Sequence, residues 1–153
     1  MTLTTSASGI DKNLDAACAS VTNELSRTDN KASLLLAFNG AVLAGLASLA
    51  DKDLPPPTKM FGAAAVLALG AAAVLLLLVV RPRLSGADRA SFPYWAQLEE
   101  TAIRDCMQGD PRAARIRILS VLAVRKFQYL RRAVDCSLTA LALLTLAAAS
   151  LAL

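Results

Sequence analysis

The chain contains no histidine, and this absence removes two common kinds of chemistry. Histidine is the residue most often used as a general base in enzymes, and it is the commonest ligand of transition metals. Cysteine is scarce, because only Cys18, Cys106 and Cys136 occur, far apart and without a Cys-x-x-Cys pair. These thiols predict small apolar side chains in a reducing compartment, not a zinc site or a disulfide framework.

The sequence patterns that mark catalytic and cofactor-binding sites are also missing. The sequence shows no glycine-rich phosphate loop, no nucleophile elbow and no cluster of metal ligands. Glu99, Glu100 and Asp105 are acidic neighbours, but such runs are more typical of a solvated helix face than of an acid–base pair. We therefore expect no catalytic activity, no metal and no cofactor.

Apolar residues, in contrast, make up 56% of the 153 residues, and three runs hold most of them. The runs are residues 33–50, 60–80 and 133–153, which are 18, 21 and 21 residues long. A helix that crosses a bilayer needs about 20 predominantly apolar residues. A soluble helix shows a polar stripe, whereas residues 60–80 include no charged residue. A soluble bundle is the alternative, but a chain this short could not easily wrap three such helices. The sequence thus predicts an all-α integral membrane protein with three transmembrane helices.

Basic residues predict the orientation of these spans in the cell membrane. Of the 16 lysines and arginines, 3 precede the first span, 2 lie in the loop 51–59 and 11 lie in residues 81–132. Basic segments stay in the cytoplasm, so residues 1–32 and 81–132 should be cytoplasmic. The loop 51–59 and the C-terminus should lie outside. Topology and solubility alone can account for this basic excess, so it need not mark a ligand site.

Helical periodicity extends from the outer spans into the cytoplasmic segments. Residues 8–32 predict an amphipathic helix capped by Ser8, residues 91–108 predict a separate helix, and Asp110 with Pro111 begins the last one. The last helix carries an apolar stripe of Ile116, Leu119, Ala123, Phe127, Leu130 and Val134. We expect two long helices, 8–50 and 110–153, each partly in water and partly in lipid, with a cytoplasmic helical head.

Aromatic residues in the predicted head allow two arrangements. Tyr94 and Trp95 can pack inside the head, or they can lie on the inner leaflet, where amphipathic aromatic rings are favoured. The sequence leaves this choice open.

Cationic side chains of the last cytoplasmic helix are the best candidates for binding a ligand. Arg125, Lys126, Arg131 and Arg132 lie one to two turns apart, and Lys31 reaches the same membrane depth if the two long helices pair. Guanidinium groups can clamp a phosphate with two hydrogen bonds. A small anionic ligand, membrane lipid headgroups and an acidic partner all fit this chemistry. Nucleic acid does not, because the cluster is close to the membrane and lacks a reading motif.

Polar and small residues within the spans indicate helix association. Asn39 can hydrogen-bond to a neighbouring helix or line a pore, and the first use is the commoner one. Small residues that allow close helix approach are Gly40 and Gly45 in the first span and Ala64, Ala68 and Ala72 in the second. Three thin spans enclose little space, so we expect a homo-oligomer.

One stretch, "RTDNKASLLLAFNGAVLAG", resembles a known family. Its Asp29, Lys31, Ala32 and Ser33 are similar to the A-D-x-K-A-S motif that opens the first span of the Pycsar effector membrane domain, with Thr28 where the family often has alanine. The later stretches "FPYWAQLE" and "VLAVRKFQYLRRAV" also look similar. The resemblance covers residues 10–153.

This resemblance implies a role in antiphage defence. In that family a companion cyclase makes a cyclic pyrimidine mononucleotide, cyclic UMP or cyclic CMP, when phage infects the cell. The membrane effector responds, the inner membrane is impaired, and the cell dies by abortive infection before phage are released. The alternative is a structural or partner-gated oligomer of a defence system, similar to the SLATT type, that senses no nucleotide directly.

Overall fold

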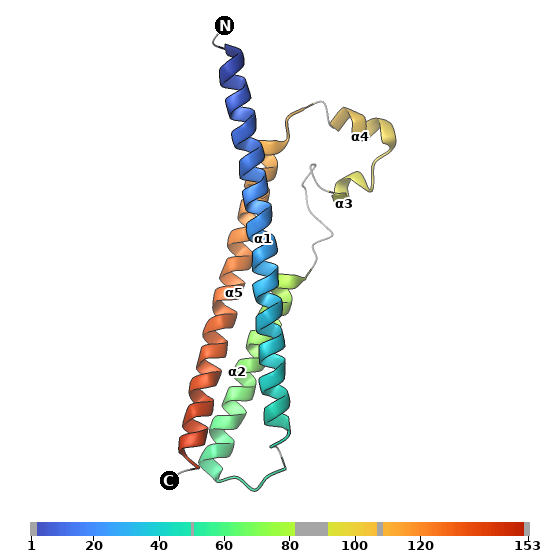
Figure 1. Ribbon diagram of the computed structural model, residues 1–153. Coiled ribbons are helices and arrows are strands. Elements are labelled where there is room, and N and C mark those ends of the chain that lie inside the picture. The colour runs from blue at the N-terminus through green and yellow to red at the C-terminus, as the bar shows by residue number, and fades with distance from the viewer. Residues whose placement is uncertain (1–2, 50, 82–91, 107–108, 152–153) are drawn as a thin grey trace. The chain divides into compact units, whose positions relative to one another are not determined.

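The computed structural model describes residues 3–49, 51–81, 92–106 and 109–151, and all its regular elements are helices (Figure 1). They are α1 (Leu3–Ala47), α2 (Pro56–Val80), α3 (Phe92–Trp95), α4 (Glu100–Cys106) and α5 (Arg112–Ala149). The predicted all-α fold with long first and last helices is therefore confirmed. The chain divides into two compact units: unit 1 is Met1–Arg27 with Pro82–Arg125, and unit 2 is Thr28–Arg81 with Lys126–Leu153.

Three of these helices, α1, α2 and α5, are long and apolar enough to cross a membrane. Even in α2, the most apolar of them, only 28% of the most hydrophobic stretch of 18 residues is buried inside the chain. Leu34, Met60 and Leu67 leave about three quarters of their surface exposed. Such outward apolar surface suits contact with lipid. The predicted spans 33–50, 60–80 and 133–153 overlap these three helices.

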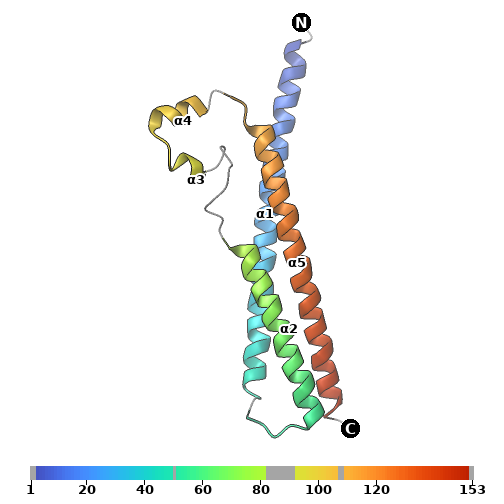
Figure 2. The same cartoon turned by 180° about the vertical axis from the view of Figure 1, so that it is seen from behind.

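Within unit 2, α1 and α5 lie side by side and point in the same direction, and α2 runs antiparallel to both (Figures 1 and 2). Contacts between side chains confirm the parallel pairing. Asp29 meets Lys126, and Asn39, ten residues further along α1, meets Ser137, eleven residues further along α5.

Residues facing the interior of unit 2 recur at alternating steps of three and four. On α1 they are Thr28, Ala32, Leu35, Asn39, Val42 and Leu46; on α2, Ala65, Leu69, Ala72, Leu76 and Val79; and on α5, Lys126, Leu130, Ala133, Ser137, Ala140 and Leu144. A spacing that averages 3.5 residues is the repeat of helices that pack as in coiled coils.

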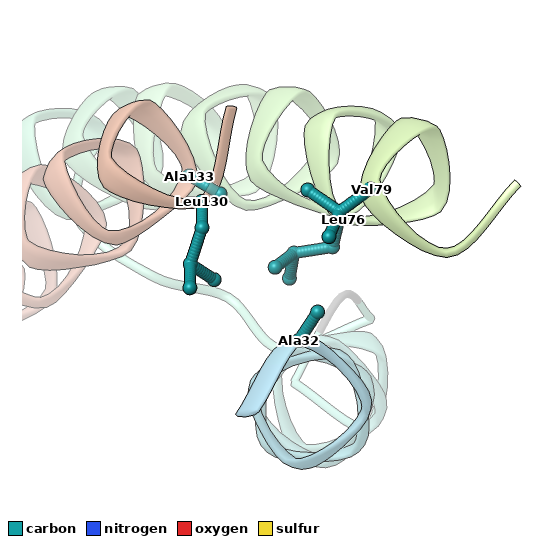
Figure 3. Packing of buried hydrophobic residues seen from close by; sticks show 5 residues of the cluster. All are labelled: Ala32, Leu76, Val79, Leu130 and Ala133. Atoms are coloured by element: carbon teal, nitrogen blue, oxygen red, sulfur yellow. The ribbon is translucent and has the colours of Figure 1, made fainter. Parts of the chain in front are cut away.

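Two apolar clusters fill this interior. The first joins Ala32 of α1, Leu76 and Val79 of α2, and Leu130 and Ala133 of α5, whose side chains point toward one another in Figure 3. The second joins Ala65 and Leu69 of α2 with Ala140 of α5, and leucine and valine residues of α1 pack against it. Alanine is common on these inner faces, so the backbones can approach closely.

Helix starts differ from the predicted ones for local reasons. α2 begins at Pro56, four residues before the apolar run, because Pro56 and Pro57 occupy first-turn positions that need no backbone N–H donor. α1 begins at Leu3, so the prediction of Ser8 as its cap is wrong. The Asp110–Pro111 prediction holds, because Asp110 Oδ1 accepts the backbone N–H of Arg112 at 3.1 Å.

The predicted single helix over residues 91–108 is wrong, although Ser91, Met107 and Gln108 lie outside the described residues. The segment forms two short helices, α3 and α4, separated by a turn at residues 96–99. Backbone bonds from Gln97 N–H to Tyr94 O and from Leu98 N–H to Trp95 O end the first piece. α4 buries no residue fully, so packing does not favour one continuous helix. Tyr94 and Trp95 are half-buried.

The predicted apolar stripe of α5 is also partly wrong. Phe127 leaves 41% of its surface exposed, and the neighbouring Lys126 takes the inner position between Ala123 and Leu130. Periodicity alone predicted Phe127 at the inner position. The three–four spacing of the packed helices instead turns Lys126 toward α1.

Enlarging a small residue on an inner face should destabilise unit 2. Ala140 is fully buried between Ala65 and Leu69, so Ala140→Leu should lower the free energy of unfolding by about 1–3 kcal/mol through overpacking. The matched control is Ala142→Leu, at nearly the same depth of α5 but exposed. Equilibrium unfolding of the full chain in mixed micelles, followed by circular dichroism, measures both. Equal effects of the two variants would contradict this packing.

Candidate functional site: polar contacts between α1 and α5

The motif at the start of the first span holds α1 against α5. Asp29 Oδ1 accepts a hydrogen bond from Lys126 Nζ at 2.6 Å, and the two side chains are 40% and 26% exposed. Ala32, three residues on, is fully buried in the first apolar cluster. Ser33 donates to the backbone carbonyl of Asp29 at 3.0 Å, and Lys31 is exposed. The motif therefore combines an interhelical ion pair, a packing contact and an exposed cation.

This ion pair is strong enough to orient two side chains and weak enough to be exchanged. An ion pair that remains in contact with water contributes only about 0–1 kcal/mol, because solvent screens it. An anion that reaches Lys126 can therefore take the place of Asp29 at a small cost. A phosphate is negatively charged like the carboxylate, and it offers more acceptor oxygens to a lysine.

The five candidate ligand residues fall into two groups. Lys126 is engaged by Asp29, whereas Arg125, Arg131, Arg132 and Lys31 are exposed. Side chains of these four make no hydrogen bond or ion pair with any residue that the structure describes. The structure thus brings Lys126 and Asp29 together and leaves four cations available at the surface. Arg125 belongs to unit 1 and the other four candidates to unit 2.

Asn39 is fully buried and bridges α1 to α5 within the chain. Its Nδ2 donates to Ser137 Oγ at 3.1 Å. The Ser137 hydroxyl lies 3.2 Å from Asn39 Oδ1 and 3.0 Å from the carbonyl of Ala133, and it can donate to one of them at a time. Both polar groups are satisfied away from lipid, where an unpaired amide would be costly. This geometry is that of a helix-to-helix contact.

A second polar contact joins α2 to the end of α5 at the other end of unit 2. The hydroxyl oxygens of Thr58, near the start of α2, and Ser150, just beyond α5, are 2.7 Å apart, and Thr58 is 5% exposed. Ser137, Thr58 and Ser150 were not singled out by sequence reasoning. Ser137 could have been found from the three–four spacing of α5. That spacing runs from Lys126 through Leu130 and Ala133 to Ser137 and places Ser137 on the face that meets α1.

The small residues of the two spans have different surroundings. Ala68 and Ala72 of α2 lie at or inside the apolar interior, and Ala64 is half-buried. Gly40 and Gly45 of α1 are exposed, and a Cβ atom added to either would meet no heavy atom within 4 Å. The alanine ridge therefore serves packing within the chain, whereas the two glycines face outward.

Unit 1 contains a cluster of charges around Arg112 that sequence reasoning also missed. The guanidinium contacts carboxylate oxygens of Asp11, of Asp15 at 3.0 Å and of Asp110 at 2.8 Å. Side-chain and backbone hydrogen bonds from Arg112 hold the pKa of Asp110 below its ordinary value. The thiol of Cys18 faces the carbonyl of Arg112 at 3.9 Å. α1 and α5 are thus tied together in unit 1 by one arginine.

The fold and these contacts define the class of protein: an all-helical membrane protein in which three helices are long and apolar enough to span the bilayer. The chain belongs to the Pycsar effector family, because the Pycsar effector protein domain matches residues 13–153. No curated protein and no solved structure shows significant similarity to the chain. The membership confirms the resemblance seen in the sequence, and it indicates a membrane effector of antiphage defence.

The buried amide–hydroxyl contact should be measurable as a coupling energy. We expect Asn39→Ala and Ser137→Ala to be coupled by about 0.6–1.7 kcal/mol in a double-mutant cycle of unfolding, the range of hydrogen bonds between membrane helices. The control pairs Asn39→Ala with Thr139→Ala, because the exposed Thr139 hydroxyl bonds, among the described residues, to the carbonyl of Asp135 in its own helix. That second cycle should show no coupling. A zero value for the first cycle would contradict the contact.

Proposed function

We propose that this chain is a membrane effector that a cyclic pyrimidine mononucleotide activates, and that it then impairs the inner membrane and kills the infected cell. The observation that carries the proposal is the match to the Pycsar effector protein domain over residues 13–153. The effect is physical and not catalytic. A companion cyclase supplies the nucleotide in this scheme.

Charge distribution supports a cytoplasmic N-terminus and an external C-terminus. Residues 81–132 carry 11 of the 16 basic residues, and the segment before the first span carries 3 more. The loop between α1 and α2 holds Asp51, Lys52 and Asp53, and Lys59 follows in the first turn of α2, so the charges at this end cancel. In this orientation the cationic side chains face the compartment in which a cyclic nucleotide is made.

The Asp29–Lys126 pair supplies a route from ligand to helix packing. A nucleotide phosphate that bonds to Lys126 replaces the carboxylate that holds α1 against α5 at this level. Binding can switch the protein only if the ligand favours one helix arrangement over the other. When a phosphate replaces Asp29 at Lys126, the ion pair between α1 and α5 is lost, because Asp29 is part of α1 and the phosphate is not. Ligand binding would therefore favour a helix arrangement that does not need this ion pair.

Direct binding and the part of Lys126 in it can be tested together by calorimetry. We expect the purified full chain to bind cyclic UMP or cyclic CMP, and the exchange Asp29→Lys with Lys126→Asp to weaken binding about tenfold or more. The exchange keeps an ion pair between α1 and α5 but removes the cation from position 126, and a hydrogen bond to a charged group contributes about 1.5–3 kcal/mol.

The matched control is the exchange Glu100→Arg with Arg104→Glu, which reverses an exposed ion pair of 2.7 Å within α4. It should leave the affinity unchanged. Folded protein that binds neither nucleotide would overturn direct sensing and favour a partner-gated effector. Unchanged affinity in the Asp29–Lys126 exchange would move the phosphate contact to other cations.

Homo-oligomerisation is part of the proposal, and the outward glycines of α1 offer a clean test. Gly45→Leu adds a side chain where the chain itself has open space, so the isolated chain should fold normally. We expect the variant to lower the oligomer mass in detergent and to reduce killing, because a bulky residue prevents close approach of a neighbouring helix. Mass photometry measures the first effect. Wild-type mass in Gly45→Leu and in Gly40→Leu would exclude this face.

A further inference from the structure

Four exposed cations lie at one level of unit 2, at the end where α2 stops. They are Lys31 of α1, Arg81 just after α2, and Arg131 and Arg132 of α5, and we call them the basic belt. The first apolar cluster sets their common level, because it joins Ala32, Val79, Leu130 and Ala133. Each belt residue is within two positions of one of these in the sequence. With a rise of about 1.5 Å per residue, the four lie within roughly one helical turn in height.

Within the part of the chain that the structure describes, the charges of the basic belt have no partner. All four residues are exposed, and their side chains form no hydrogen bond or ion pair with the residues that the structure describes. Asp135, one turn further along α5, is exposed and does not pair with Arg131 or Arg132. Lys126 differs, because Asp29 neutralises it. The belt therefore presents an uncompensated positive charge.

The belt also marks the depth at which the surface of unit 2 changes character. Beyond it, toward the loop between α1 and α2, large apolar side chains are exposed on all three helices: Leu34, Leu77 and Leu138 are 73%, 55% and 58% exposed. Tyr129, an amphipathic aromatic residue, packs half-buried against the first apolar cluster at the same level. Such rings favour the headgroup region of a bilayer. Cations at this depth are therefore placed where lipid phosphates would lie.

We propose that the basic belt binds the headgroups of anionic phospholipids in the cytoplasmic leaflet. Arginine can bond to phosphate oxygens with two parallel hydrogen bonds, and lysine acts as a point charge. The far end of unit 2 offers no such surface, because the charges of Asp51 and Asp53 are balanced by those of Lys52 and Lys59. This inference rests on membrane insertion and does not depend on nucleotide gating.

Lipid retention by the purified full chain tests the belt. Native mass spectrometry from micelles with equal amounts of phosphatidylglycerol and phosphatidylcholine counts the lipids that stay bound. We expect the wild type to retain phosphatidylglycerol preferentially. Lys31→Gln, Arg131→Gln and Arg132→Gln together should lower this preference at least tenfold, since each juxtamembrane cation changes anionic-lipid binding roughly fivefold. Arg81→Gln alone should lower it about fivefold.

The matched control neutralises two lysines at the far end, Lys52→Gln with Lys59→Gln, and should keep the wild-type preference. Lys31→Arg with Arg131→Lys and Arg132→Lys, which conserves every charge, should keep it as well. Circular dichroism confirms folding of each variant. The proposal is overturned if the triple glutamine variant retains phosphatidylglycerol as the wild type does, or if the far-end control loses it equally. Displacement of the bound lipid by micromolar cyclic UMP or cyclic CMP would also overturn it, because the belt would then be a nucleotide site.

Discussion

The structure depends on the parallel pairing of α1 with α5. Each contact joins a residue of α1 to one of α5 about a hundred positions later, as Asp29 with Lys126 and Asn39 with Ser137 show. Apolar contacts between alanine-rich faces would allow α1 to slide along α5, whereas the side-chain amide of Asn39 has its partner, Ser137, at one position only. A slip of one turn would leave the Asn39 amide unpaired among apolar groups, which is costly, whereas Ser137 would keep its bond to the Ala133 carbonyl of its own helix. The polar contacts therefore set the register, and the apolar clusters stabilise it.

The pairing of α1 with α5 decides which side chains of unit 2 face inward and which face outward. Small residues such as Ala32, Ala133 and Ala140 occupy the inner faces, because association of helices in lipid relies on close packing more than on the hydrophobic effect. Large apolar residues such as Leu67 face outward, where a soluble protein would place polar groups. The same three helices would be a poor soluble bundle and are a reasonable membrane bundle.

Hydropathy was sufficient to predict the three spans and the two long helices, because lipid exposure requires long uninterrupted apolar runs. The break at residues 96–99 was not predictable from the apolar pattern, since short helices with little burial are decided by local turns. The inward positions of Lys126 and Ser137 were not predicted, for another reason. Amphipathic analysis assigns charged and hydroxyl groups to the outer face, and only the pairing of α1 with α5 turns these two inward.

Depth decides which of the polar contacts a ligand can influence. Asn39 and Ser137 are at most 5% exposed, so neither a nucleotide nor an ion reaches them without unpacking the helices. Asp29 and Lys126 keep 40% and 26% of their side-chain surface in contact with solvent, and their bond is one that a dissolved anion can replace. In the proposed mechanism, an activating anion would therefore act on the end of unit 2 that lies near the basic belt. In that mechanism the buried contact between Asn39 and Ser137 would hold α1 and α5 together while their spacing changes near Asp29 and Lys126.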